Sequence, residues 1–169
     1  MPYTRIAAAC VAAATALVVG ASLSGCATSA GGSADALAVA KRQTLSMETQ
    51  IAAFLPKSSI ISVNQPTRSK IIFPCLNKQN ESYWPGTMTI SLKPGLDTTH
   101  ILDAIGSHWT NKSGWTVSNS TAADGTPTMD ITSSSGYNYT AEFAAGPVFT
   151  VTSGSGCFPN SGLAGKSSY

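Results

Sequence analysis

The sequence is poor in charged residues, because Lys, Arg, Asp and Glu together make up 11% of its 169 residues. The ten Lys and Arg residues nearly balance the eight Asp and Glu residues and leave a formal net charge of +2. Such a surface lacks the basic field that attracts a nucleic acid or a strongly anionic membrane. The composition therefore predicts no nucleic-acid partner.

The common signatures of catalysis and metal binding are also missing. The chain has no Gly-x-Ser-x-Gly elbow, no Ser-x-x-Lys motif and no Cys-x-x-Cys dithiol. Its two histidines, His100 and His108, are too far apart in the sequence for a metal-binding i,i+4 pair. Asp97 and Asp103 flank His100, but a metal needs three or four converging ligands. We therefore expect no catalytic residue, metal or cofactor, although a dispersed catalytic triad stays open as an alternative.

Long hydrophobic runs are absent outside the beginning of the chain. The apolar stretch 6–19 follows Arg5 and has about 14 residues, whereas a membrane-spanning helix needs about 20. A cation, a short apolar run and then small residues are typical of an export signal. Residues 1–25 are therefore expected to be a signal peptide, and the rest of the chain is expected to face water.

The expected signal ends in Leu23-Ser24-Gly25-Cys26, which has the pattern of a bacterial lipobox. The pattern predicts that Cys26 is the lipidation site and the first residue of the mature protein. A diacylglyceryl group on its sulfur would bring two chains, where a single chain anchors a protein only marginally. The expected location is the extracytoplasmic face of the cell membrane. An ordinary secretory signal and an uncleaved anchor are the alternatives.

The cysteines reduce to one pair in the mature chain. Cys10 lies in the expected signal and Cys26 carries the lipid, which leaves Cys75 and Cys157 in an oxidising compartment. A disulfide between them would close a loop of roughly 80 residues, for which the chain-entropy model gives about 4–5 kcal/mol. Two separate buried thiols are the alternative.

The mature chain divides into three parts. Residues 26–33 are mostly small and predict a flexible tether, and residues 159–169 are rich in Gly and Ser and predict a loose tail. Residues 34–158 have the size of one domain with room for a core.

Two helices and several strands are expected in this domain. Residues 34–55 have apolar residues at three-to-four spacing until Pro56, and a second helix begins at Asp97 or Thr98 and ends before Gly114. Period-two alternation and turn residues predict strands at 59–63, 70–73, 87–92, 115–118, 128–132, 137–143 and 148–152. The fold class is α+β, with two helices packed on one face of a mainly antiparallel, partly meandering sheet that is braced by one disulfide.

Aromatic residues are the candidates for ligand binding. Trp84 and Tyr83 lie in the polar, turn-rich segment 77–86, so Trp84 is expected to be exposed and both are possible ligand contacts. Together with Trp84, other aromatic residues could line a groove for a sugar or a lipid, namely Trp109, Trp115, Tyr137 and Tyr139. Trp109 and Trp115 also fit a hydrophobic core.

The order of these features resembles that of the small LppA-like lipoproteins of mycobacteria and related actinobacteria. The matching residues are Cys26, Cys75, Gly114-Trp115, Gly136-Tyr137 and Gly156-Cys157-Phe158, and the resemblance covers roughly residues 70–158 together with the export signal. It implies a lipid-anchored envelope protein with a helix–sheet body and a cysteine pair, and it implies no catalytic residue.

Together the patterns predict a lipid-anchored lipoprotein of the cell envelope that acts as a non-catalytic interaction module. Its expected partners are the membrane, through the lipid on Cys26, and an unidentified envelope protein, lipid or glycan. One alternative is a binder or carrier of a lipid or cell-wall ligand, with a cavity between the sheet and Leu102, Ile105 and Trp109. A second alternative is an envelope hydrolase that uses one of the histidines with a Ser and an Asp.

Overall fold

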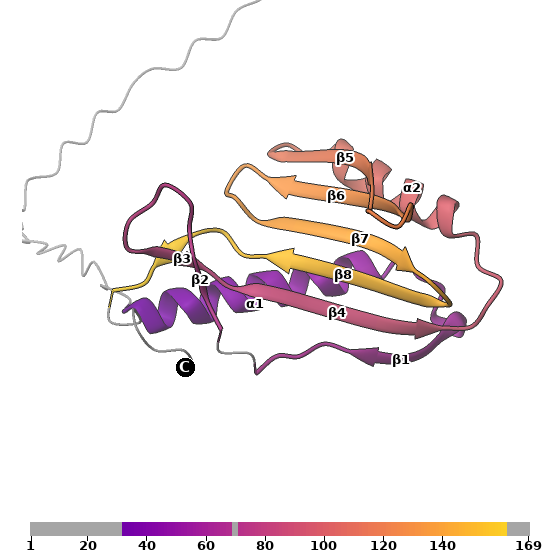
Figure 1. The fold of residues 1–169 in the computed structure, drawn as a ribbon, viewed down its shortest axis with the longest axis horizontal. Helices are drawn as coiled ribbons and strands as arrows, with labels where there is room; N and C mark the ends of the chain where they lie inside the picture. The colour runs from indigo at the N-terminus through magenta and orange to yellow at the C-terminus, as the bar shows by residue number, and fades with distance from the viewer. Residues whose placement is uncertain (1–31, 69–70, 162–169) are drawn as a thin grey trace, which may run out of the picture. The chain divides into compact units, whose positions relative to one another are not determined.

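The computed structural model describes residues 32–68 and 71–161 (Figure 1). The expected signal peptide, the lipidation site Cys26, most of the tether and most of the tail lie outside the described residues. The two helices are α1, Ser33–Ala52, and α2, Thr98–Thr110, and a short 3-10 turn, η1, covers Lys57–Ser59. Neither helix is long and apolar enough to cross a lipid bilayer.

The strands of the described chain form two sheets. The larger sheet has the strand order β1-β4-β8-β7-β6-β5 and the smaller has the order β2-β3-β9, with antiparallel pairing throughout. The strands are β1 Ile60–Asn64, β2 Phe73–Pro74, β3 Glu81–Tyr83, β4 Pro85–Leu92, β5 Trp115–Thr121, β6 Pro127–Ser133, β7 Asn138–Ala144, β8 Val148–Gly154 and β9 Phe158–Pro159.

The expected fold class is confirmed. Both helices lie on the same side of the larger sheet, and β5 to β8 form a meander (Figure 1). The apolar stripe of α2 is buried as expected, and Asp97 caps the helix because its carboxylate accepts a hydrogen bond of 3.0 Å from the backbone N–H of His100. Cys75 and Cys157 form the expected disulfide, with a sulfur–sulfur distance of 2.04 Å.

Strand register explains why one face of the larger sheet is covered and the other is open. Met88 pairs with Val151, which pairs with Ala141, and this buried rank faces the helices. The next rank along the strands joins Thr87, Thr152 and Thr140, and these side chains lie on the opposite, helix-free face. Because successive side chains alternate between the two faces, the Thr and Ser residues of the pattern form the solvent face.

The polar segment 77–86 differs from its predicted structure. It was expected to be a turn-rich loop, but it contains β3 and the first residues of β4. Asn77 and Asn80 adopt positive φ angles of 59° and 62° in the turn between β2 and β3. This turn brings the carbonyl of Glu81 to the backbone N–H of Cys75, which donates a hydrogen bond of 3.0 Å. A tight hairpin thus replaces the expected loop.

Two other boundaries also differ. Of the predicted strand 70–73, Phe73 belongs to β2 and the two residues before it lie in no strand, and Pro159, which was expected to be the first residue of the loose tail, belongs to β9. The small sheet holds this last segment, since the backbone N–H of Asn160 donates a hydrogen bond of 2.9 Å to the carbonyl of Asn80.

Candidate functional site

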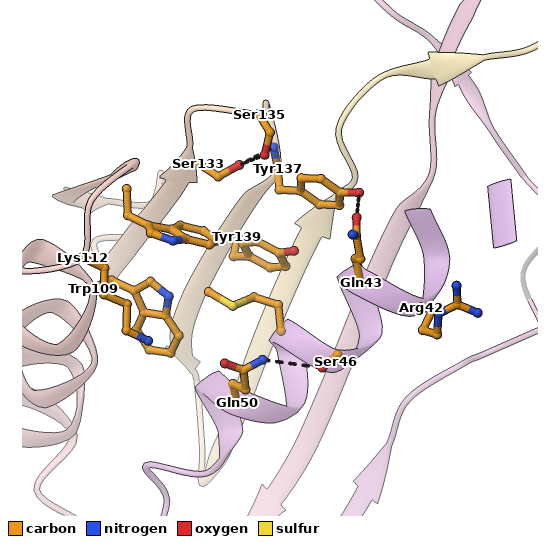
Figure 2. Close-up of a pocket in the computed structure, with 12 residues that line it drawn as sticks. Arg42, Gln43, Ser46, Gln50, Trp109, Lys112, Ser133, Ser135, Tyr137 and Tyr139 are labelled. Atoms are coloured by element: carbon orange, nitrogen blue, oxygen red, sulfur yellow. Dashed lines mark hydrogen bonds between the residues drawn. The ribbon is translucent and has the colours of Figure 1, made fainter. Parts of the chain in front are cut away.

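An open groove of about 510 Å³ lies between the two helices at one end of the larger sheet (Figure 2). We call it the aromatic groove, because four aromatic side chains line it. The helix α1 contributes Arg42, Gln43, Ser46, Met47 and Gln50, and the other side is formed by Trp109, Lys112, Trp115, Ser133, Ser135, Tyr137 and Tyr139.

The connection from α2 to β5 positions the two tryptophans. Trp109 lies in the last turn of α2 and Trp115 is the first residue of β5. The short link between them contains Gly114, whose φ of +80° suits a residue without a side chain. The Lys112 ammonium lies 4.8 Å from the centroid of the Trp109 ring, which is within the range of a cation–π contact. A cation and two indole rings therefore converge at this end of the groove.

The turn between β6 and β7 positions the tyrosines and serines. Tyr137 and Tyr139 are two residues apart, and this spacing in an extended chain places both side chains on the helix-covered face. The Ser133 hydroxyl lies 2.9 Å from the Ser135 hydroxyl and accepts a hydrogen bond of 3.0 Å from the backbone N–H of Tyr137. The Tyr139 ring lies 6.4 Å from the ring of Trp115, measured between centroids.

The α1 side of the groove is polar. The Tyr137 phenol donates a hydrogen bond to the side-chain oxygen of Gln43, which joins the β6–β7 turn to the helix (Figure 2). One helical turn further on, the Gln50 amide lies 3.5 Å from the Ser46 hydroxyl. The amide and hydroxyl groups along this wall can both donate and accept hydrogen bonds.

Burial moves the pKa of both phenols further above physiological pH. It raises the pKa of Tyr139 well above its usual range, with a hydrogen bond to Thr44 opposing part of the effect, and it also raises the pKa of Tyr137. Both phenols are therefore neutral hydrogen-bonding groups at physiological pH. Since the lining also includes Arg42 and Lys112, the groove has a neutral aromatic centre and two cations at its border.

A buried carboxyl lies on α1 beside this groove. Glu48 has an exposed fraction of 0%, and its side chain accepts hydrogen bonds from the Ser153 hydroxyl at 2.5 Å and from the Gln65 amide at 2.7 Å. Burial raises the pKa of Glu48, while the bonds from Ser153 and Gln65 lower it. The carboxyl sits over β4 so closely that a Cβ atom on Gly86 would lie 2.4 Å from its oxygen. Gly86 therefore makes room for Glu48.

The structure separates the predicted ligand contacts. The expectation that Trp84 is exposed is wrong, because its exposed fraction is 0% and it packs in a second core cluster with Leu37, Ala40 and Phe158. Tyr83, the other candidate, is half-buried and stacks on Phe73 in the small sheet. The other four aromatic residues all border the aromatic groove, where Trp115 and Tyr137 are half-buried while Trp109 and Tyr139 are buried, so Trp109 takes the core position that the sequence also predicted.

The predicted cavity over α2 is filled. Leu102, Ile105 and Trp109 all belong to the main hydrophobic core, and Ile105 is completely buried, whereas Leu102 also borders an open hollow of about 330 Å³ beside Met129 and Phe143. A hollow of about 520 Å³ lies instead along the outer side of α2 and β5, and its described lining residues include no aromatic side chain. The groove that unites the aromatic residues is at the other side of this helix, towards α1.

Neither histidine contributes to a catalytic or metal-binding cluster in the described part of the chain. His100 and His108 are exposed, and His108 packs edge-on against Phe54 and Trp109. Within residues 32–68 and 71–161, no hydrogen bond joins either imidazole to a Ser or an Asp, and no three His, Cys, Asp or Glu residues are placed to hold a metal ion.

Sequence reasoning missed the polar wall of the groove and the buried carboxyl. Gln43, Ser46 and Gln50 recur at helical spacing on α1, so they form a second stripe beside the apolar one. Thr44 and Glu48 are four residues apart and both lie on the buried face. The spacing of these polar residues was the available signal, since a polar side chain within an apolar stripe must find partners in the fold.

Comparison of the chain with family models, with curated proteins and with solved structures finds no match.

Proposed function

We propose that the protein is a lipid-anchored, non-catalytic interaction module of the cell envelope, and that it binds a saccharide in the aromatic groove. The observation that carries the proposal is one open groove in which the half-buried rings of Trp115 and Tyr137 lie together with hydroxyl and amide groups, above a floor that includes the buried rings of Trp109 and Tyr139. The resemblance to the LppA-like lipoproteins and the lipid on Cys26 belong to the same proposal. They supply the location, and the groove supplies the activity.

The groove chemistry favours a saccharide over a lipid chain. A lipid chain needs an enclosed apolar cavity, whereas this site is open and mixes rings with hydrogen-bonding groups. An aromatic face offers a flat apolar surface for the C–H face of a sugar ring, and neighbouring amides and hydroxyls suit the sugar hydroxyls. The described lining residues include no Asp, Glu or His, which supports binding without bond cleavage.

The groove can be tested with the unlipidated mature chain, in which Cys26 is replaced by Ser. Titration with oligosaccharides released from the cell envelope should change the tryptophan fluorescence, because Trp109 and Trp115 line the site. Trp115→Ala and Tyr137→Ala should each weaken binding by about tenfold, the equivalent of about 1.4 kcal/mol. Phe73→Ala is the matched control, since Phe73 is an exposed aromatic residue outside the groove. Equal affinity of all three variants would disprove the site.

The anchor requires a separate test. Cys26→Ala should block lipidation in a bacterial host and release the protein from the membrane fraction, and mass spectrometry of the parent should show the added lipid. Membrane retention of the Cys26→Ala variant would refute lipid anchoring and would leave the saccharide site unaffected.

A further inference from the structure

The end of the domain where α1 begins carries exposed apolar side chains. The tip of the β2–β3 turn has Leu76, with an exposed fraction of 91%, and the segment leading into it has Ile71 at 52% and Phe73 at 45%. The Phe73 ring stacks on that of Tyr83, with 5.7 Å between centroids. We call the surface formed by Ile71, Phe73, Leu76 and Tyr83 the apolar end face.

Alternation along this segment directs these side chains outward. Ile72, between Ile71 and Phe73, packs against the buried cluster of Trp84 and Phe158. In an extended chain the neighbours of an inward residue point the other way. Because Phe73 pairs with Tyr83 across the small sheet, their rings lie on the same outer face.

Hydrogen bonds through the C-terminal segment place the β2–β3 turn near the first residue of α1. The Ser33 hydroxyl donates a hydrogen bond of 2.5 Å to the carbonyl of Ser161. The adjacent Asn160 contacts Asn80 through its backbone and the Ser82 hydroxyl through its side chain, at 2.9 Å and 2.7 Å. The β2–β3 turn thus lies at the end of the domain that meets the tether, as Figure 1 also shows for β2, β3 and the beginning of α1.

The length of chain between the anchor and this end limits the distance to the membrane. Cys26 and Ser33 are seven residues apart in the sequence, and such a segment spans at most about 25 Å even when fully extended. A domain of this size has a radius of gyration of about 14 Å. The apolar end face is therefore held within about one domain diameter of any bilayer that holds the lipid on Cys26.

We infer that the apolar end face docks on the lipid bilayer, with Leu76 entering the interface. The inference rests on the proposed lipid anchor, which brings this end of the domain to the membrane. Leu76 supplies the apolar tip, and the stacked pair Phe73 and Tyr83 suits the boundary between water and lipid, where aromatic residues concentrate. Amphipathic helices that lie in this boundary bury their apolar face by about 5–10 Å, and Leu76 would need to enter to a similar depth.

The charges near the face predict how docking depends on the lipid. Lys78 in the turn is paired with Glu81, with 3.0 Å between nitrogen and oxygen, and Arg68 is an exposed cation in the described part of the preceding segment. Because apolar side chains form the contact surface and the charges lie at its border, docking should depend on apolar insertion and should persist at high salt and without anionic lipid. The aromatic groove is lined by other residues of the domain, so docking of the apolar end face would leave it open to solvent.

The test anchors the mature chain chemically, so that its result does not depend on biological lipidation. With Cys75 and Cys157 in a disulfide, Cys26 is the remaining thiol of the mature chain and can be joined to a maleimide lipid in phosphatidylcholine vesicles. Leu76→Trp places a fluorophore at the turn tip. Ile61→Trp is the matched control, because Ile61 is also exposed but follows the far end of α1, about 30 Å away along the helix.

Brominated lipid should quench the added fluorescence of Leu76→Trp and shift its emission to shorter wavelength, while Ile61→Trp should show neither change. The same result is expected with phosphatidylglycerol in the vesicles and at high salt. Equal quenching of the two variants would overturn docking. A third outcome is that lipid quenching of Leu76→Trp disappears at high protein concentration while sedimentation shows a dimer. The apolar end face would then bind a second copy of the chain rather than the bilayer. None of these outcomes bears on whether cells attach lipid to Cys26.

Discussion

The main body of the domain and the small module at one end of it are stabilised in different ways. The body, made of the larger sheet and both helices, has a core in which sixteen buried residues of the described chain pack together. The end module, made of β2, β3, β9 and the beginning of α1, has a cluster of four buried residues, Leu37, Ala40, Trp84 and Phe158. An isolated hairpin of short strands is marginal on its own, and here β9, the beginning of α1 and the Cys75–Cys157 disulfide support the β2–β3 hairpin.

The difference matches the functions that we propose for the two regions. A saccharide site gains from rigid walls, and the aromatic groove is built from α1, α2 and strands of the well-packed body. A membrane-docking tip gains from exposed apolar residues, which a small module can present only if something other than burial holds it together. The disulfide meets this need, because Leu76 follows Cys75 directly.

Removal of the disulfide should have the largest effect on this comparison. The Cys75→Ser/Cys157→Ser double variant should lose about 4–5 kcal/mol in the chain-entropy model, and less if the module opens before the body. We expect hydrogen exchange to accelerate first in β2, β3 and β9, while β6, β7 and β8 keep their protection. The reduced parent protein is the control with native side chains. Uniform loss of protection in both regions would show that the module and the body unfold as one unit.

The second prediction concerns Gly86, at the point where the chain passes from the module into the body. A Cβ atom there would lie 2.4 Å from a Glu48 oxygen, 2.5 Å from the Ser153 hydroxyl and 2.9 Å from the Trp84 ring. Gly86→Ala should therefore lower the free energy of unfolding by about 1–3 kcal/mol, as overpacking of a core does.

A matched control is Gly125→Ala in the β5–β6 turn. A Cβ atom on Gly125 meets no heavy atom within 4 Å, so its cost comes from the positive φ of +88° alone. Chemical denaturation of both variants separates crowding from backbone strain. Because Gly86 touches residues of both regions, its substitution should destabilise both, whereas Gly125→Ala should leave the module unchanged. An unchanged melting temperature for Gly86→Ala would contradict the packing.

The body was predictable from sequence to a greater extent than the module. Its elements are long enough to show a period, as in α2, where Ile101, Leu102, Ile105 and Trp109 mark the buried stripe, and in β4, where Met88, Ile90 and Leu92 alternate with polar residues. The two-residue strands β2 and β9 have no period to detect. Trp84 was misjudged because its burial depends on Leu37 and Phe158, which are distant in the sequence.

The candidate site was predictable in its residue types but not in its walls. The aromatic residues stood out individually, and strand alternation placed Tyr137 and Tyr139 on one face. Their contact with α1 depends on how the helix crosses the sheet, so the role of Gln43 and Gln50 appeared only in the folded chain. The disulfide partners, in contrast, followed from elimination among four cysteines.

The smallest expected effect is the change in stability with pH that comes from Glu48, whose carboxyl lies beside Gly86, where the module meets the body. Burial raises the folded-state pKa of Glu48 above 4.5, so the folded protein holds this proton more tightly than the unfolded chain does. The resulting contribution to stability is fully present below pH 4.5 and is lost as pH rises through the folded-state pKa. The hydrogen bonds from Ser153 and Gln65 favour the ionised form and keep the loss small.

Glu48→Gln should flatten this part of the pH profile, because the amide does not ionise. Its oxygen can still accept from Ser153, and Gln65 can turn its own amide towards the new amide nitrogen only by giving up its 3.0 Å hydrogen bond to the Leu45 carbonyl, which lowers the stability of the variant by a similar amount at every pH. As pH rises from 4, the melting temperature of the parent should fall relative to that of Glu48→Gln. The difference between the two proteins should stop changing at the acid end, where Glu48 is protonated in both the folded and the unfolded state. If the parent gains stability relative to Glu48→Gln as pH rises, the sign is reversed. The ionised form of Glu48 would then be more stable in the folded protein than in the unfolded chain, and the hydrogen bonds from Ser153 and Gln65 would outweigh the cost of burying the charge.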